Sequence, residues 1–187
     1  MGKLTYGMNV SIDGYIEDRN RDLGWTTPDD EVFQYFTDRV RSTSVALYGR
    51  RLYEGMAAHW PAAGQAPDVS AAHAEYSRVW CDMPKVVFSR TLTSVDWNSR
   101  LAQGDPVEVA KKLKAETDGI VEVVGATLAA PVVQAGLVDE FTIVVMPAAV
   151  GGGTSFIPEL ESWVKLRLLE NRTFPSGVVL LRYEAVR

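Results

Sequence analysis

Apolar positions along the chain follow two different periods, and their alternation predicts an α/β fold. Short runs rich in β-branched and aromatic residues are typical of buried strands, and such runs occupy residues 4–10, 45–49, 85–89, 120–124 and 137–146. Between them, apolar residues recur at helical spacing, which predicts helices over about 27–41, from 50 onward, and over 70–80, 105–117 and 128–137. A further short strand is expected at 95–97, and residues 55–69 are expected to be irregular.

The last part of the chain has a different pattern. Residues 163–170 and 177–185 alternate or run apolar around a turn at 174–177, which is typical of an antiparallel strand pair. The whole order predicts one three-layer α/β domain spanning residues 1–187, with a mostly parallel mixed sheet, an antiparallel C-terminal strand pair and helices on both faces. Ligands of such open sheets bind beyond the carboxyl ends of the strands. The candidate loops therefore follow Val10, Tyr48, Phe88, Val124 and Met146.

Composition narrows the range of functions. The chain has 187 residues, 47% hydrophobic, with a net charge of −5. This length suits one well-buried core, and the acidic balance argues against a nucleic-acid partner, which usually requires a basic patch. No apolar run approaches the roughly 20 residues that span a membrane, and no leader-like segment opens the chain. Cys81 is the single cysteine, and His59 and His73 are the two histidines. We therefore expect a cytoplasmic protein without a disulfide or metal site, acting on a small molecule.

Three of the candidate loops carry groups suited to anions. The strand ending at Val124 turns at Gly125 into a helix, whose first amides are unpaired and favour a phosphate. The loop after Tyr48 places a glycine before two arginines, whose planar guanidinium groups match phosphate oxygens. The loop after Phe88 flanks an arginine with hydroxyl groups and suits the 2′-phosphate of NADP. Each loop also has a simpler explanation. The glycine corner could be a packed turn, the arginine pair could be solvated at the surface, and the loop after Phe88 could be a capped turn. Three such loops at the ends of strands nevertheless favour a nucleotide site.

Side chains for acid–base chemistry are scarce. The sequence contains no Gly-x-Ser-x-Gly motif, and neither histidine has an evident nucleophile or carboxylate partner, so both are expected at surface or packing positions. The best candidates are the acids Asp29, Asp30 and Glu31 at the start of the first helix, where one carboxyl group could face a ligand. Acids in a first helical turn also stabilise the helix without any further role. Thr27 is expected to cap this helix and Pro28 to be its first residue.

Five segments in this order resemble the dihydrofolate reductase superfamily. The most similar members are small stand-alone proteins related to the reductase domain of bacterial riboflavin biosynthesis. The matching segments are residues 11–16 (SIDGYI), 48–54 (YGRRLYE), 86–92 (VVFSRTL), 124–128 (VGATL) and 135–140 (AGLVDE), completed by Pro147 and the glycines at 151–153. The resemblance covers nearly the whole chain. No single segment is specific, but their order and spacing are.

The resemblance implies an NADPH-dependent reductase of the dihydrofolate-reductase-like fold. In such a protein the first strand and the segment after it would face the nicotinamide carboxamide through their backbone. The two arginines and the glycine corner would meet the pyrophosphate, and the loop after Phe88 would meet the 2′-phosphate. The implied cofactor-binding residues are Asn9, Ile16, Gly49, Arg50, Arg51, Ser89, Arg90, Gly125, Ala126, Thr127 and Leu128.

The resemblance also implies an acid that faces the hydride acceptor. In the family this acid follows a tryptophan and a proline at the start of the first helix, and Asp30 matches this place, with Asp29 and Glu31 as alternatives. Asp30 would orient the acceptor or assist its protonation. The acceptor would be flat and heterocyclic, either pterin-like or ribosylaminopyrimidine-like. The expected acceptor pocket consists of Trp25, Tyr53, Met56 and Trp60, whereas Phe33 is expected in the core.

Two residues depart from the family pattern. Leu52 stands where the folate enzymes place a threonine hydroxyl on the pyrophosphate, and Ala126 stands where a second glycine is usual. Two other functions stay open: a flavin-using reductase, with FMN or another flavin in the acceptor pocket, and a non-catalytic nucleotide-binding protein. Because the family often pairs through edge strands or C-terminal elements, a homodimer is expected through the apolar strands at 163–169 and 178–181.

Overall fold

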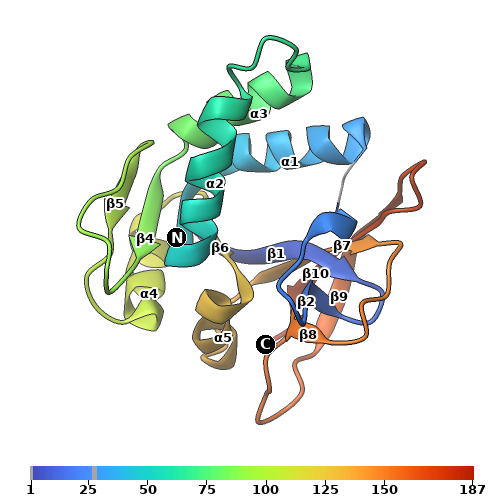
Figure 1. Ribbon diagram of the computed structural model, residues 1–187. Coiled ribbons are helices and arrows are strands. Elements are labelled where there is room, and N and C mark those ends of the chain that lie inside the picture. The colour runs from blue at the N-terminus through green and yellow to red at the C-terminus, as the bar shows by residue number, and fades with distance from the viewer. Residues whose placement is uncertain (1, 27–28) are drawn as a thin grey trace.

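The computed structural model describes residues 2–26 and 29–187, whose strands form an eight-stranded mixed sheet (Figure 1). Across this sheet the order is β5-β4-β3-β6-β1-β7-β10-β9. The strands from β5 to β7 pair in parallel, whereas β10 is antiparallel to both β7 and β9. Their bounds are β1 (Lys3–Ser11), β3 (Thr43–Gly49), β4 (Lys85–Phe88), β5 (Ser99–Leu101), β6 (Ile120–Val124), β7 (Glu140–Met146), β9 (Leu166–Thr173) and β10 (Val179–Ala185).

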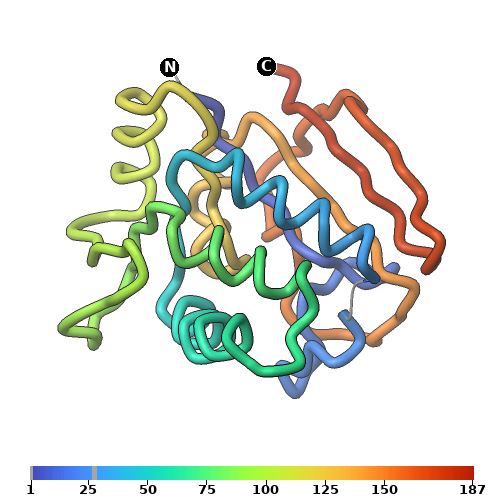
Figure 2. Tube along the Cα trace, turned by 90° about the horizontal axis from the view of Figure 1, so that it is seen from above, coloured from blue at the N-terminus to red at the C-terminus, as the bar shows by residue number. Residues whose placement is uncertain are grey.

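Helices cover both faces of the sheet, as Figures 1 and 2 show. One face carries α1 (Asp30–Ser42), α2 (Arg50–Ala63) and α3 (Ala71–Asp82), and the other carries α4 (Pro106–Glu116) and α5 (Ala126–Gln134). Alternate residues of a strand enter the two cores: Val45 and Leu47 pack toward α4 and α5, whereas Ala46 and Tyr48 pack toward α1, α2 and α3. The predicted α/β fold with a C-terminal antiparallel pair is confirmed.

A small second sheet and a short helix complete the described fold. β2 (Tyr15–Asp18) pairs antiparallel with β8 (Gly153–Ser155), which joins the segment after β1 to the glycine loop after β7. The short 3-10 helix η1 (Gly24–Thr26) precedes α1. Within the described residues, no helix is both long and apolar enough to cross a membrane.

Two predicted elements are wrong. Residues 55–69 were expected to be irregular, but α2 continues to Ala63 with Pro61 inside it. Met56 and Trp60 pack against the core under α1 and α3, and this tertiary packing outweighs the low helix propensity of proline. No strand forms at 95–97, since the backbone of Asp96 is held by the Tyr53 hydroxyl group, which accepts from its amide at 2.8 Å and donates to its carbonyl oxygen at 3.1 Å.

The first helix begins differently from the prediction. Thr27 and Pro28, expected as its cap and its first residue, lie outside the described residues. Asp29 is the N-cap, and its side chain accepts a hydrogen bond of 2.8 Å from the amide of Val32. Other boundaries shift slightly: α5 begins at Ala126 rather than at residue 128, and β7 begins at Glu140 rather than at residue 137.

Candidate functional site

The carboxyl ends of four neighbouring parallel strands form one border of the sheet, which we call the nucleotide edge because the resemblance implies a nucleotide there. The order β4-β3-β6-β1 places these strand ends side by side. Most of the residues implied for cofactor binding therefore gather there although they are far apart in sequence. The nucleotide edge consists of Asn9, Gly49, Arg50, Arg51, Ser89, Arg90 and Gly125, followed by Ala126, Thr127 and Leu128 in the first turn of α5.

The two helices that begin at the nucleotide edge start without a side-chain cap. Gly49 precedes α2 and Gly125 precedes α5, and among the described residues neither N-terminus has a capping side-chain hydrogen bond. In contrast, α1, α3 and α4 are capped by the side chains of Asp29, Ser70 and Asp105. The φ angle of Gly125 is 99°, which L side chains rarely adopt. The first amides of α2 and α5 thus point to a place where an anion can bind.

Two arginines at this edge, Arg50 and Arg51, already have carboxylate partners. Arg51 Nη2 donates to both carboxylate oxygens of Glu17, at 2.8 and 2.7 Å, and Arg50 pairs with Glu54 at 3.2 Å. Glu17 also accepts a 2.6 Å hydrogen bond from the Thr154 hydroxyl group. Burial raises the pKa of Glu17, but the hydrogen bonds from Thr154 and Arg51 outweigh burial and hold this pKa below its usual value. Arg51 therefore ties α2 to the small β2–β8 sheet.

Other residues at the edge serve local structure. The Ser89 hydroxyl group accepts hydrogen bonds from the amides of Thr91 and Leu92, at 3.1 and 2.9 Å, which is the capped turn considered above. Arg90 beside it is exposed. Ala126 and Leu128 are buried in the core under α5, as is Ile16.

The two departures from the family pattern occupy packed positions. A Cβ atom added at Gly125 would lie 3.4 Å from Leu52 Cδ2, so this leucine packs beside the glycine corner. Ala126 is 7% exposed and belongs to the core cluster. The extra carbon atoms at both positions are therefore accommodated by packing.

A cavity of about 770 Å³ lies next to the nucleotide edge, on the face that α1, α2 and α3 cover. Its walls combine apolar side chains with a group of aromatic and imidazole rings. The rings of Phe33 and His73 stack at 4.4 Å, and those of Trp60 and Tyr76 lie 4.4 Å apart. We call it the aromatic cavity; its aromatic and imidazole lining consists of Phe33, Phe36, Tyr48, His59, Trp60, His73 and Tyr76. Such a space suits a flat ring that stacks on its walls.

The residues expected in the acceptor pocket divide into two groups. Met56 and Trp60 line the aromatic cavity, whereas Trp25 and Tyr53 are not among its lining residues. Tyr53 is buried with its hydroxyl group held by Asp96, and the Trp25 indole donates to the Asp22 carbonyl oxygen at 3.1 Å. Phe33 is both a core residue and part of the wall.

None of the three acids at the start of α1 lines the aromatic cavity. Asp29 caps the helix, and hydrogen bonds from Ser176 and the Val32 amide hold its pKa below the usual value. Glu31 pairs with Arg172 at 3.1 Å near the protein surface. Asp30 is exposed in the first turn. A catalytic role for Asp30 thus stays a prediction.

The structure brings other charged residues to the floor of the cavity. Arg39 of α1 and Glu122 of β6 both line it, and Arg39 Nε donates to Glu122 Oε1 at 2.6 Å. The Thr43 hydroxyl group donates to Glu122 Oε2 at 3.1 Å. Sequence reasoning missed this pair and also placed both histidines outside any site. The only signal was a glutamate within an apolar strand, in the run Ile120–Val124.

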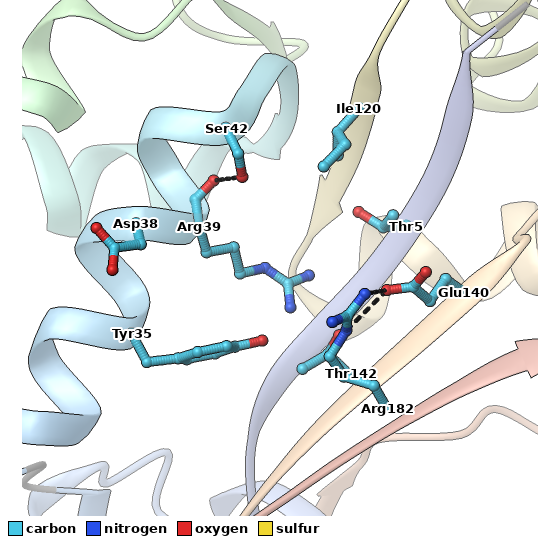
Figure 3. Close-up of a pocket in the computed structure, with 9 residues that line it drawn as sticks. All are labelled: Thr5, Tyr35, Asp38, Arg39, Ser42, Ile120, Glu140, Thr142 and Arg182. Carbon is cyan, nitrogen blue, oxygen red and sulfur yellow. Dashed lines mark hydrogen bonds and ion pairs between the residues drawn. The ribbon is translucent and has the colours of Figure 1, made fainter. Parts of the chain in front are cut away.

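Two further observations define the floor. Asn9 lines the cavity, and its buried Oδ1 atom has no hydrogen-bond partner within the described part of the chain. Arg39 extends from α1 toward β1 (Figure 3), where Tyr35 and Arg182 line a second hollow of about 230 Å³. Burial lowers the pKa of Arg39, but Glu122 and Tyr35 together outweigh this effect and raise it, so the guanidinium group stays charged. Arg39 thus lines both hollows.

Known proteins with similar sequence or fold include reductases. The family model of the RibD C-terminal domain matches residues 2–180. The uncharacterised protein YyaP of Bacillus subtilis (strain 168) is 28% identical over 182 residues, 97% of this chain and 94% of that protein. A Shewanella sp. PV-4 structure, provisionally named a riboflavin biosynthesis protein, has a TM-score of 0.74 at 20% identity and 99% coverage of both chains. Dihydrofolate reductase from Enterococcus faecalis, complexed with NADP(H) and RAB-propyl, has a TM-score of 0.66 at 13% identity, covering 99% of this chain and 97% of that one.

Proposed function

The chain belongs to the RibD C-terminal domain family, and we propose that it is an NADPH-dependent reductase that transfers hydride to a flat heterocyclic acceptor. One observation carries this proposal: the nucleotide edge and the aromatic cavity share a border. Asn9, Leu52 and Val124 line the cavity, and each belongs to or adjoins a segment implied for the cofactor. A nicotinamide ring bound at the edge would therefore face a ring stacked in the cavity.

The residues at the nucleotide edge fit the dinucleotide. The uncapped amides of α2 and α5 suit the pyrophosphate, and exposed Arg90 suits the 2′-phosphate. Asn9 Oδ1, which has no partner among the described residues, would accept a hydrogen bond from the nicotinamide carboxamide or from the acceptor beside it. NADPH supplies the hydride when it is bound. This chain's own contribution is to bind the cofactor and the acceptor, to align the nicotinamide with the acceptor ring, and to exclude water from both rings.

The acceptor is proposed to be pterin-like or ribosylaminopyrimidine-like, stacked on Trp60 and Phe33. Asp30 is kept as the proposed residue that orients the acceptor or assists its protonation. In a flavin-using reductase, an isoalloxazine would occupy the same walls, and the cavity volume lies in the range typical of small-molecule sites. The pterin- or pyrimidine-like ring and the isoalloxazine are all planar, so any of them could stack on the walls of the aromatic cavity.

Calorimetric titration with NADPH and NADH tests the proposal. We expect NADPH to bind more tightly than NADH, and Arg90→Ala to remove roughly 10-fold of that preference, because a charge-assisted contact to the 2′-phosphate is lost. Arg78→Ala is the matched control, since Arg78 is an exposed arginine of α3 paired with Asp82. If neither nucleotide binds, the reductase proposal is wrong. NADPH binding without turnover of pterin or flavin acceptors, unchanged by Asp30→Ala, would favour a non-catalytic nucleotide-binding protein.

We also propose that the protein forms a homodimer through β9. Trp163, Leu166, Leu168 and Leu169 are exposed, and β9 is an edge strand, so this surface is suited to pairing. The segment 178–181 contributes less than expected, because Val178 and Leu180 are buried in the core. Sedimentation velocity should show a dimer that Leu168→Glu converts to a monomer, whereas Ile12→Glu, at another exposed apolar residue, should leave it dimeric. A monomeric wild-type protein would contradict this proposal.

A further inference from the structure

The Arg39–Glu122 pair lies inside the protein, against the central strands of the sheet. The Arg39 side chain is 16% exposed and that of Glu122 is 9% exposed. Removing two charges from water carries a large desolvation cost, so a buried ion pair is weak evidence for a stabilising role. Glu122 is flanked on β6 by Val121 and Val123, which are fully buried. A stabilising purpose alone therefore does not explain charged residues at this place.

The backbone of β1 is shaped to admit the guanidinium group. A Cβ atom added at Gly7 would lie 2.6 Å from Arg39 Nη2 and 2.8 Å from Thr142 Cβ. Any other residue at position 7 would displace the arginine. Figure 3 shows Tyr35 and Arg39 both reaching from α1 toward β1. Since Gly7 itself lines the aromatic cavity, the gap that the glycine leaves is filled by Arg39 at the cavity floor.

The pair retains hydrogen-bonding capacity beyond its own contact and the contact of Arg39 with Tyr35, and both of its residues line the cavity. A carboxylate offers about four acceptor sites and a guanidinium group five N–H donors. Glu122 receives Arg39 and the Thr43 hydroxyl group, and Asn9 adds a buried Oδ1 without a partner in the described residues. The floor thus offers donors from Arg39 next to acceptors from Glu122 and Asn9. Its ligand must present the complementary pattern, a carbonyl oxygen beside an N–H group.

Charge restricts the ligand further. Among the described residues that line the cavity, Arg39 and Glu122 are the permanently charged ones, and each neutralises the other. A phosphate on the acceptor would therefore meet no uncompensated cation on this lining, whereas an uncharged ring would meet aromatic walls. The lining favours a neutral ring system.

Resting on the proposed function, we propose that Arg39, Glu122 and Asn9 recognise the lactam edge of an uncharged planar heterocycle. The carbonyl oxygen of that edge accepts from Arg39, and its N–H group donates to Glu122 or to Asn9 Oδ1. Phe33 and Trp60 stack on the ring. These residues determine which acceptor binds and how its plane is oriented toward the nucleotide edge.

Lumiflavin and 3-methyllumiflavin are suitable probes, because they differ only at N3, where a methyl group replaces the hydrogen of the N–H group. Binding is measured by quenching of flavin fluorescence, with no nucleotide present. We expect the wild-type protein to prefer lumiflavin roughly 10- to 100-fold, the range for hydrogen bonds to charged groups. Equal affinity for the two probes, or binding of neither, would overturn the proposal.

The double variant Arg39→Met/Glu122→Leu tests which residues cause the preference. Replacing both partners of a buried pair by apolar residues of similar size is often tolerated, so this variant avoids an unpaired buried charge; circular dichroism checks its fold. The ratio of its affinities for lumiflavin and 3-methyllumiflavin should fall to about 1. The matched control is Arg41→Met/Glu75→Leu, which removes an exposed pair between α1 and α3 outside the cavity lining. The control should keep the wild-type preference. A folded Arg39→Met/Glu122→Leu variant that keeps it would overturn the proposal.

This experiment separates the recognition site from the proposed function. A lumiflavin preference without NADPH binding would refute the reductase and support the recognition site. NADPH binding without a lumiflavin preference would support the reductase and refute the recognition site.

Discussion

The nucleotide edge and the aromatic cavity are built in different ways. At the edge, short continuous segments present backbone amides and exposed side chains, as at Gly49 and Gly125. In the cavity, side chains from α1, α2, α3 and the central strands converge, and a buried ion pair forms the floor. The edge depends on local conformation, whereas the cavity depends on tertiary packing. Substitutions should therefore affect nucleotide binding at the edge and overall stability in the cavity.

The largest expected effect is that of Arg39→Met alone. This change leaves Glu122 buried without its charged partner, and breaking a buried pair on one side costs about 3–5 kcal/mol of unfolding free energy. Urea unfolding measures this loss. Arg41→Met on the same helix removes exposed contacts to Asp38 and Glu75 and should cost less than about 1 kcal/mol. Similar losses of unfolding free energy in the two variants would show that the cavity floor tolerates the loss of an ion-pair partner as well as the protein surface does.

Gly125→Ala should have the next largest effect, and it should reduce both the stability of the fold and the affinity for NADPH. The φ angle of 99° at Gly125 is strained for alanine, which costs about 1–3 kcal/mol. The altered corner should also weaken NADPH binding, as measured by calorimetry. Gly49→Ala is the matched control, because the φ angle of Gly49 is −74° and an added Cβ atom would lie 3.9 Å from Leu128 Cβ. If Gly49→Ala were as harmful as Gly125→Ala, backbone strain would not be the cause.

Loss of a helix cap away from the nucleotide edge should have a smaller effect. The Asp105 side chain accepts from the amides of Val107 and Glu108, at 2.9 and 3.3 Å, at the start of α4. Asp105→Ala should lower the unfolding free energy by about 1 kcal/mol. Thermal unfolding measures this change, and NADPH affinity should stay the same. A change in NADPH affinity would mean that capped and uncapped helix starts do not have separate roles.

Sequence patterns predicted the fold because they act locally. Strand periodicity, the glycine corner and the cap at Ser70 each depend on a few neighbouring residues. The failures had tertiary causes. The helix through Pro61 is held by packing on α3, and the irregular segment at Asp96 is held by a tyrosine far away in sequence.

The candidate site divides in the same way. The nucleotide edge was assembled from segments that resemble a known family, and the structure places their strand ends side by side. The aromatic cavity was foreseen only at Met56 and Trp60. His73 lies there because it stacks on Phe33 of another helix, and Glu122 is matched to Arg39 across 83 residues. No local pattern contains information on such pairings.

The smallest effect concerns acid stability at Glu17, the partner of Arg51 in the small β2–β8 sheet. The pKa of Glu17 is lowered in the fold, because the hydrogen bonds from Thr154 and Arg51 outweigh burial. A carboxyl group with a lowered pKa stabilises the fold above its unfolded pKa of about 4.3, and this contribution disappears as the pH falls through the folded value. Glu17→Gln should therefore cost less than about 1 kcal/mol at pH 7, since Arg51 is half exposed. Urea unfolding at several pH values should show the two proteins converging in acid. Glu54→Gln, which removes the exposed partner of Arg50, is the control and should show the same pH dependence of stability as the wild-type protein. If Glu17→Gln also showed the wild-type pH dependence, Glu17 would not be the origin of this acid sensitivity.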